Sequence, residues 1–283
     1  MKAYQYIVEK QLQWAHNKKI ILINNGIRSK SYYTKKLEDN LFDALDPDVK
    51  REFEKGDGGE LCGNPQKMCA LHSSSALEIN IFYYWKRINQ INKIAHACGF
   101  CNEDNGNCRS INFEYKCFIN KCFSRSPNID VVINNSLGSK VKVFAVECKF
   151  SEAYSSRGHL GLKQKYLKLE EWAEMPNLLE LAKSISPEDR IFNYLHAAQL
   201  IKHILGLTVN CGKDGFRLLY LWYDCLGEEG AKHKKEIENF IKITKADNIV
   251  FHTLSYQELI VALSNQNRSN HESYINYISS RYL

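Results

Sequence analysis

The segment KVKVFAVECKF, residues 140 to 150, constrains the fold more than any other part of the chain. Its apolar run VKVFAV has the length and the β-branched and aromatic content of a buried strand. The run ends at Glu147 and Lys149, and a charged side chain is costly to bury unless something compensates its charge. The sequence therefore predicts a core strand whose far end meets water or compensating charge.

Alternation of side chains along this strand separates its residues into two faces. One face is apolar until its charged end and carries Val141, Val143, Ala145, Glu147 and Lys149. The opposite face carries Phe144, Val146, Cys148 and Phe150. Cys148 is therefore predicted to point into the core. Glu147 and Lys149 share the other face, where a divalent metal, a phosphate or a solvated cleft would offset the cost of burial.

A carboxylate on the preceding segment is predicted to lie beside Glu147. Residues 128 to 135, NIDVVINN, form a second expected strand, and a turn around residues 136 to 138 joins the two. The outer ends of two strands in such a hairpin meet, which brings Asp130 close to Glu147. Two carboxylates with a lysine nearby suit a hard metal, because Mg²⁺ takes one or two carboxylates together with waters and phosphate oxygens.

The spacing of an acidic residue and a lysine is a weak signal by itself. It occurs three times, at Asp48 and Lys50, at Glu114 and Lys116, and at Glu147 and Lys149. A salt bridge on an edge strand would explain it. The third copy differs because it ends a buried strand whose hairpin partner carries Asp130, whereas Asp48 lies in a stretch expected to be helical and exposed.

The order of the other elements predicts an α/β fold with one mixed central sheet flanked by helices. Residues 1–60 are expected to form a helical N-terminal arm, with helices over the opening segment and residues 32–45 and a break near residues 24–26. Residues 61–283 are expected to form the main domain, in one compact unit with the arm. Periodicity and capping predict further elements: a helix from Ser74, a strand at 111–119, a helix at 191–207, a central strand at 216–224, a helix at 229–246, a strand at 248–254 and two terminal helices.

Composition and charge exclude few classes of protein. The 283 residues carry a formal net charge of +6, which permits binding to a polyanion without demonstrating it. No apolar run approaches the roughly 18 residues of a membrane span, and the first residues lack the apolar core of a signal peptide. We therefore expect a cytoplasmic protein with no membrane partner.

The hairpin that carries Asp130, followed by Glu147, Cys148 and Lys149, resembles the PD-(D/E)xK nuclease signature of restriction endonucleases and related DNA-cleaving enzymes. The order of a helix, three strands, a helix and a fourth strand is also similar to the core of that superfamily. A closer likeness, to a group of bacterial restriction-endonuclease-like proteins, rests on six segments: LHSSSALEINIF, INFEYK, PNIDVVI, VECKFSE, AAQLIKHILGL and LLYLWYD. One departure is that Pro127 stands three residues before the aspartate rather than immediately before it.

The resemblance implies roles for four residues. It makes Asp130 and Glu147 ligands of Mg²⁺ or Mn²⁺, and it makes Lys149 the group that orients the attacking water and stabilises charge on the phosphate. Gln199, on the helix after the motif, matches a glutamine that contacts the site in some members. The implied function is metal-dependent hydrolysis of DNA in restriction or defence, by a monomer or a homodimer. Two alternatives stay open: a non-catalytic DNA- or protein-binding module with the same fold, and a zinc-organised interaction protein.

Other polar residues near the motif have structural as well as functional explanations. Glu78 and Glu114 compete for a further acidic position that many members of the superfamily place on or near the first helix. Lys202 and His203 could contact phosphate, but we expect solvated surface residues at both positions. Residues 72–75, HSSS, are expected to cap a helix rather than to supply a nucleophile.

Ten cysteines without a secretory signal predict reduced thiols or a metal site rather than disulfides. Cys98 and Cys101 have the spacing of a zinc knuckle, and the ligands that could complete a site are His96, Cys108, Cys117 and Cys122. Unliganded thiols are the favoured interpretation and structural zinc the alternative.

Two lysine clusters are expected to be solvated, and as DNA-backbone contacts they would make binding salt-dependent. They consist of Lys163, Lys165 and Lys168, and of Lys232, Lys234 and Lys235.

Overall fold

The computed structural model describes residues 1–23, 31–121, 123–124, 126–155, 159–267 and 269–283. Within these residues a mixed five-stranded sheet has the strand order β1-β2-β3-β4-β5, which confirms the predicted fold class. The pairs β1–β2 and β2–β3 are antiparallel, and β3–β4 and β4–β5 are parallel. The strands are β1 (Cys108–Lys116), β2 (Asn128–Asn135), β3 (Val143–Lys149), β4 (Phe216–Trp222) and β5 (Phe251–Ser255).

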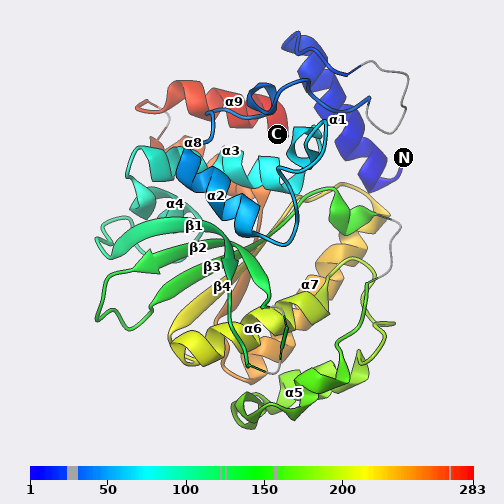
Figure 1. Ribbon diagram of the computed structural model, residues 1–283, viewed down its shortest axis with the longest axis vertical. Helices are drawn as coiled ribbons and strands as arrows, with labels where there is room; N and C mark the ends of the chain where they lie inside the picture. The colour runs from blue at the N-terminus through cyan, green and yellow to red at the C-terminus, as the bar shows by residue number, and fades with distance from the viewer. Residues whose placement is uncertain (24–30, 122, 125, 156–158, 268) are drawn as a thin grey trace.

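Helices cover both faces of this sheet (Figure 1). One layer contains α1 (Ala3–Asn17), α2 (Pro47–Lys55), α3 (Ser74–Arg87), α4 (Ile91–Ala97), α8 (Tyr256–Asn267) and α9 (Glu272–Tyr282). The other contains α5 (Pro176–Ser184), α6 (Ala197–Cys211) and α7 (Glu228–Ala246). Short 3-10 turns connect them: η2 (Leu37–Asn40), η3 (Lys67–Cys69), η4 (Glu152–Tyr154), η5 (Gln164–Lys168) and η6 (Glu170–Glu174).

The two faces of β3 pack into two separate cores, as alternation predicts. Phe144, Val146 and Cys148 lie in the core beneath α3 and α8. Val143 and Ala145 lie in the opposite core, beneath α6. Cys148 is buried, which confirms that it points inward. β3 is the middle strand of the sheet and not an edge strand, so its charged end needs more than an exposed salt bridge to explain it.

The N-terminal arm contains less helix than its sequence predicts. α1 and α2 are helical, but residues 32–45, expected to be a helix, hold only the short turn η2. The Asn40 side chain donates to the carbonyls of Met68 and Ala70 at 2.7 and 2.9 Å, and the Thr34 N–H donates to the carbonyl of Cys69 at 2.9 Å. These tertiary hydrogen bonds overcome the local helix propensity. The expected break at residues 24–26 lies outside the described residues.

The arm and the main domain share one apolar core. Ile7, Leu41 and Phe53 of the arm pack in the same cluster as Phe144 and Val146 of β3. Contacts between the arm and the sheet are therefore part of the fold, and a domain boundary at residue 60 stays a prediction.

The helix expected at residues 191–207 begins later than its periodicity predicts, at Ala197. Glu236, on α7, accepts the backbone N–H groups of Asn193, Tyr194 and Leu195 at 2.9 Å each. Because one carboxylate satisfies three consecutive N–H groups, this segment is stable without helical hydrogen bonds. The loop that results leads into α6 beside the end of β3.

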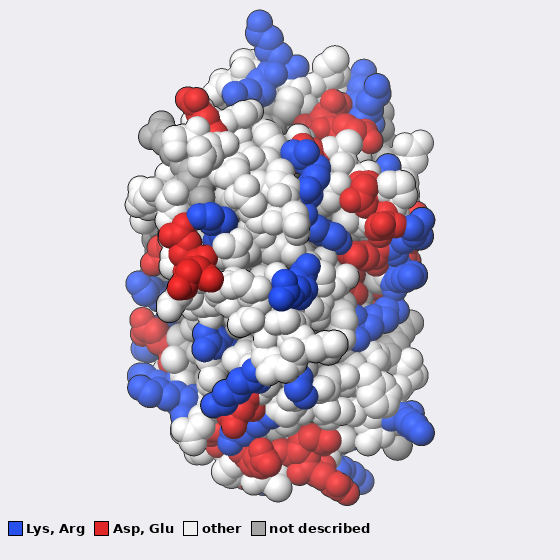
Figure 2. All heavy atoms as spheres, turned by 90° about the vertical axis from the view of Figure 1, so that its left-hand side faces the viewer, with Lys and Arg blue, Asp and Glu red and all other residues white. Residues whose placement is uncertain are grey.

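Charges of both signs are mixed on the face that Figure 2 shows. Lys and Arg side chains alternate there with groups of Asp and Glu, so the net charge is not gathered into one basic patch on this face. The predicted lysine clusters are exposed in the structure, as expected for solvated groups. Among the described residues, no helix has the length and apolarity that a membrane crossing requires.

Candidate active site

The predicted site lies at one end of the β2–β3 hairpin. The register pairs Val131 with Val146, so the next step along the two strands places Asp130 opposite Glu147. Asp130 Oδ2 accepts the backbone N–H of Cys148 at 2.7 Å, which fixes the carboxylate across the strands. Lys149 Nζ forms an ion pair with Glu147 Oε1. The structure therefore brings Asp130, Glu147 and Lys149 together, and their chemical roles stay predictions.

Glu147 is fully buried, and both of its oxygens are engaged. Oε1 accepts from Lys149, and Oε2 lies 2.7 Å from Nε2 of His203 on α6. Burial acts to raise the pKa of Glu147, but Lys149 and His203 outweigh it and lower this pKa to about 2. An ionised carboxylate only accepts hydrogen bonds, so His203 carries a proton on Nε2 in this contact.

Asp130 is the less readily ionised carboxylate of the pair. Burial and the negative charge of Glu147 raise the pKa of Asp130 well above its usual range. Burial opposes the charge of Lys149, but Glu147 and Asp130 outweigh it and raise the pKa of the ammonium. One lysine faces two carboxylates, so Asp130 and Glu147 are not both readily ionised unless a further cation binds.

The first turn of α3 lies against the end of β3. Ser73 caps the helix, as predicted, because its Oγ accepts the N–H of Ala76 at 3.2 Å. Ser74 Oγ donates to the carbonyl of Cys148 at 3.3 Å. Glu78 lies four residues after Ser74 and therefore on the same side of the helix. This spacing directs Glu78 toward the end of the hairpin.

Glu78 and Glu114, the two competing acidic candidates, both lie at the site. Glu78 is 2% exposed, and its Oε1 has no hydrogen-bond partner among the described residues. Burial, with the charges of Asp130 and Glu114, raises the pKa of Glu78 well above its usual range. Burial also raises the pKa of Glu114, which accepts a hydrogen bond from Asn128 at 2.9 Å. Glu114 has a φ of +50°, a strained backbone conformation that is often found at functional sites.

These residues face an open cleft with a volume of about 1460 Å³. Asp130, Glu78, Glu114 and Lys149 line it, whereas Glu147 is buried behind them. The chemistry of the donors fits a divalent cation, because the Glu78 oxygen is unpartnered and the carboxylates lack a counter-ion. In the described part of the chain, no three His, Cys, Asp or Glu side chains form a ready-made metal cage. Mg²⁺ does not require one, since it binds through one or two carboxylates and completes its shell with water.

α6 brings to Glu147 a histidine that the sequence analysis did not place there. Gln199 is half-buried in the first turn of α6, and it is His203, one turn later, that contacts Glu147. His203 is fully buried, so the expectation of a solvated surface residue is wrong. Its spacing from Leu200 and Leu207 places it on the apolar face of the helix, a signal from which its burial could have been predicted.

Glu60 is a further cleft residue that the sequence did not reveal. It lies in the glycine-rich loop 55–65, and burial raises the pKa of its carboxyl group. The Met68 N–H donates to the Glu60 carbonyl at 3.0 Å, which turns this loop back toward the start of α3. Neither periodicity nor a motif marks a loop residue of this kind, so no sequence signal was present.

The cysteine cluster is divided between the two ends of β1. Cys101 and Cys108 form a thiol hydrogen bond at the start of the strand, and His96 Nδ1 lies 2.9 Å from the carbonyl of Cys101. Cys117 follows the other end of β1 and packs against Gly206 of α6. It therefore lies apart from Cys98 and Cys101, and Cys122 is outside the described residues. The cysteines that the structure describes are free thiols, and structural zinc stays an untested alternative.

The sheet, its two helical layers and the acidic end of the hairpin define a restriction-endonuclease-like protein. The chain belongs to the family described as Restriction Endonuclease associating with ARP, whose family model matches residues 9–283. Comparisons with curated proteins and with solved structures give no match. The matched range includes most of α1 as well as the sheet, so it extends beyond the segments that carry the resemblance in the sequence.

Proposed function

We propose that this protein is a metal-dependent nuclease of the PD-(D/E)xK type that hydrolyses phosphodiester bonds of DNA. The observation that carries the proposal is the convergence of Asp130, Glu78 and Glu114 on one cleft beside the ammonium of Lys149. A divalent cation would offset the carboxylates, and a phosphate would offset the lysine. Membership of a restriction-endonuclease family supports this reaction, and a role in restriction or defence rests on that membership alone.

Each residue has a task in this proposal. Asp130 and Glu147 offer carboxylate oxygens to Mg²⁺ or Mn²⁺, and Glu78 or Glu114 adds a further acidic group. The bound ion supplies a lowered pKa for its water and positive charge beside the phosphate. Lys149 orients the attacking water and stabilises negative charge on the phosphate oxygens. His203 holds Glu147 through Oε2, so the carboxylate keeps its orientation when Lys149 turns toward the substrate.

One observation favours a second candidate function, a non-catalytic DNA- or protein-binding module. Glu147 is engaged by Lys149 and His203 at the same time, so its charge is already compensated without metal. In a binding module this ion pair would stay closed. In a nuclease Lys149 must leave Oε1 so that both groups reach metal and substrate.

Cleavage of plasmid DNA distinguishes the two candidates. Wild-type protein and Lys149→Ala are incubated with methylated and unmethylated supercoiled plasmid in Mg²⁺, Mn²⁺ or EDTA. We expect metal-dependent cutting by the wild type and a loss of about 10²–10³-fold in Lys149→Ala, the scale of removing one group that stabilises transition-state charge. Lys242→Ala changes an exposed lysine of α7 and is the matched control.

Two outcomes would contradict the proposal. A wild type that binds these plasmids but cuts none of them in either metal would be the binding module. A Lys149→Ala protein that cuts as fast as the wild type would show that the chemistry is located elsewhere.

A further inference from the structure

A second pocket opens on Lys149, beside the carboxylate cleft. It has a volume of about 480 Å³, within the usual range of small-ligand sites, and is formed by the segment after β3 together with α6. Lys149 and Glu152 line both hollows, so the two are contiguous. A group bound in this pocket would lie next to whatever the ammonium of Lys149 contacts.

Positive charge dominates the pocket. Its charged lining residues are Lys149, Lys163, Lys165, Lys202 and Glu152. Neither Lys163 nor Lys202 forms an ion pair with a carboxylate in the described part of the chain. Burial lowers the pKa of Lys202, and the charges of Lys163 and Lys149 add to this effect against the opposing charge of Glu147. An anion would relieve this repulsion.

Two histidines add hydrogen-bonding groups to the same wall. The rings of His159 and His196 stack with their centroids 4.7 Å apart. Burial and the charge of Lys149 lower the pKa of His196 to about 4, so its ring is neutral at pH 7. His159 Nε2 is buried and has no hydrogen-bond partner among the described residues. The pocket therefore offers polar groups that the protein itself leaves unsatisfied.

Two tyrosines form part of the remaining wall, together with small and aliphatic residues. Tyr166 and Tyr194 line the pocket with Leu162. Tyr166 stacks on Phe123 with centroids 4.4 Å apart, and Lys165 Nζ lies 4.6 Å from the centroid of the Phe123 ring. Lysines beside aromatic faces are the combination by which proteins hold the phosphates and bases of single nucleic-acid strands.

We propose that this pocket binds a nucleotide of the substrate strand adjacent to the phosphate at Lys149, with the nucleotide's own phosphate held by Lys163 and Lys202. The inference rests on the proposed function in taking a nucleic-acid strand as the substrate. A nucleic-acid strand and a free nucleotide both present the nucleotide phosphate that this pocket would bind. The experiment therefore tests each of them separately.

Binding is measured on the full chain in EDTA, where no metal-dependent cleavage occurs. Fluorescence anisotropy follows a labelled single-stranded oligonucleotide, a labelled duplex and a labelled deoxynucleoside monophosphate at several salt concentrations. The variants are Lys163→Gln, Lys202→Gln and the double variant, with Lys242→Gln as the control of equal charge change for each single variant and Lys242→Gln with Lys245→Gln for the double variant. Lys163 is exposed, so its variant tests the pocket even if substitution of half-buried Lys202 disturbs folding.

We expect the double variant to bind the oligonucleotide about tenfold more weakly. The slope of log affinity against log salt should decrease by about one for each lysine removed, while Lys242→Gln behaves as the wild type. Unchanged oligonucleotide affinity and slope in the double variant would overturn the inference. Weaker binding of the monophosphate alone would also overturn it, because the pocket would then serve a free nucleotide.

This measurement is independent of the cleavage test. A protein that cuts no plasmid but shows the expected loss in the lysine variants would retain the nucleotide pocket and lose only the nuclease proposal. If the wild type cuts DNA but the double variant binds the oligonucleotide as the wild type does, the nuclease proposal is kept and the nucleotide pocket is lost.

Discussion

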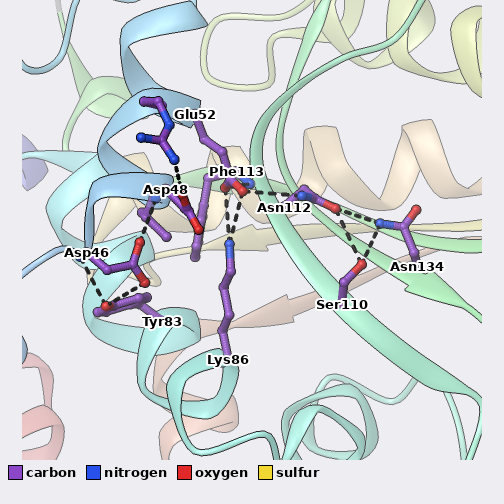
Figure 3. Close-up of polar contacts among 11 residues, drawn as sticks. Asp46, Asp48, Glu52, Tyr83, Lys86, Ser110, Asn112, Phe113 and Asn134 are labelled. Carbon is purple, nitrogen blue, oxygen red and sulfur yellow. Dashed lines mark hydrogen bonds and ion pairs between the residues drawn. The ribbon is translucent and has the colours of Figure 1, made fainter.

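Two groups of carboxylates at the sheet differ in how completely their charge is compensated. Glu52 of α2 accepts from Lys86 Nζ at 3.0 Å, from the Phe113 N–H at 2.9 Å and from Asn112 Nδ2 at 3.3 Å (Figure 3). It thereby ties α2 and α3 to the edge strand β1. At the end of the hairpin, Asp130, Glu78 and Glu114 have raised pKa values, principally because they are buried, and Glu78 Oε1 is unpartnered.

The difference separates a structural carboxylate from candidate ligands. A folded chain compensates a buried charge where the charge serves only the fold, and it tolerates uncompensated charge where a ligand supplies the counter-ion. Glu147 is also compensated in this structure, by Lys149 and His203, but in the proposed nuclease Lys149 turns away and frees Oε1 for the metal. The uncompensated charge lies one step away, on Asp130 and the two glutamates. We therefore expect substitutions in the two groups to affect different properties.

The largest expected effect is on activity, in Asp130→Asn. The amide keeps the shape of the side chain but removes the negative charge, so we expect cleavage in Mg²⁺ to fall by about 10²–10³-fold. The melting temperature in EDTA should stay the same or rise, because a repulsive charge has been removed. Plasmid cleavage and thermal melting measure the two effects. If Asp130→Asn is strongly destabilised but its folded fraction still cuts DNA, Asp130 is a structural carboxylate like Glu52.

Much of this site could be predicted from the sequence because it depends on local periodicity. Alternation along 140–150 placed Glu147 and Lys149 on one face, and the hairpin brought Asp130 opposite them. These relations hold within one hairpin and need no knowledge of distant contacts. The strands at 128–135 and 216–224 follow from composition in the same way.

The remaining features depend on contacts between distant segments. The side chains of Asn40 and Glu236 form hydrogen bonds that replace helical ones at 32–45 and 191–196. No local sequence pattern predicts the partners of these two side chains. His203 meets Glu147 across 56 positions in the chain. Its burial could have been predicted from the apolar face of α6, but its partner could not. The role that the resemblance implies for Gln199 stays a prediction, and the structure adds His203 as a contact of Glu147.

The next effect is on stability, in Glu52→Gln. The amide leaves Lys86 without a counter-ion and turns an N–H group toward other donors, so we expect the free energy of unfolding to fall by about 1–3 kcal/mol. Both members of the ion pair are partly exposed, which keeps the expected loss below that of a fully buried pair. Urea denaturation measures the change.

Cleavage per folded molecule of Glu52→Gln should equal that of the wild type, because the hydrogen-bond partners of Glu52 among the described residues do not line the cleft. If Glu52→Gln instead loses cleavage activity while its free energy of unfolding is unchanged, Glu52 acts in catalysis and the two groups of carboxylates do not differ as proposed.

The smallest expected effect is on the pH dependence of stability, in Glu78→Gln. The pKa of Glu78 is raised in the folded protein by burial and by neighbouring carboxylates, so the folded state holds this proton more tightly than the unfolded state. The contribution of Glu78 to the free energy of unfolding is then fully present below the usual pKa of 4.5 and is lost as pH rises toward the folded-state pKa. Glu78→Gln lacks this proton, so its melting temperature in EDTA should decrease less steeply between about pH 5 and pH 8.

Asp130 and Glu114 still titrate in Glu78→Gln, so part of the slope should remain. Mg²⁺ provides the complementary measurement, because a cation bound in the cleft favours the ionised carboxylates and should flatten the slope of the wild type. Melting curves at several pH values, in EDTA and in Mg²⁺, give both comparisons. If the wild type and Glu78→Gln have parallel slopes in EDTA, Glu78 is compensated like Glu52, and the negative charge available to a cation is confined to the hairpin and Glu114.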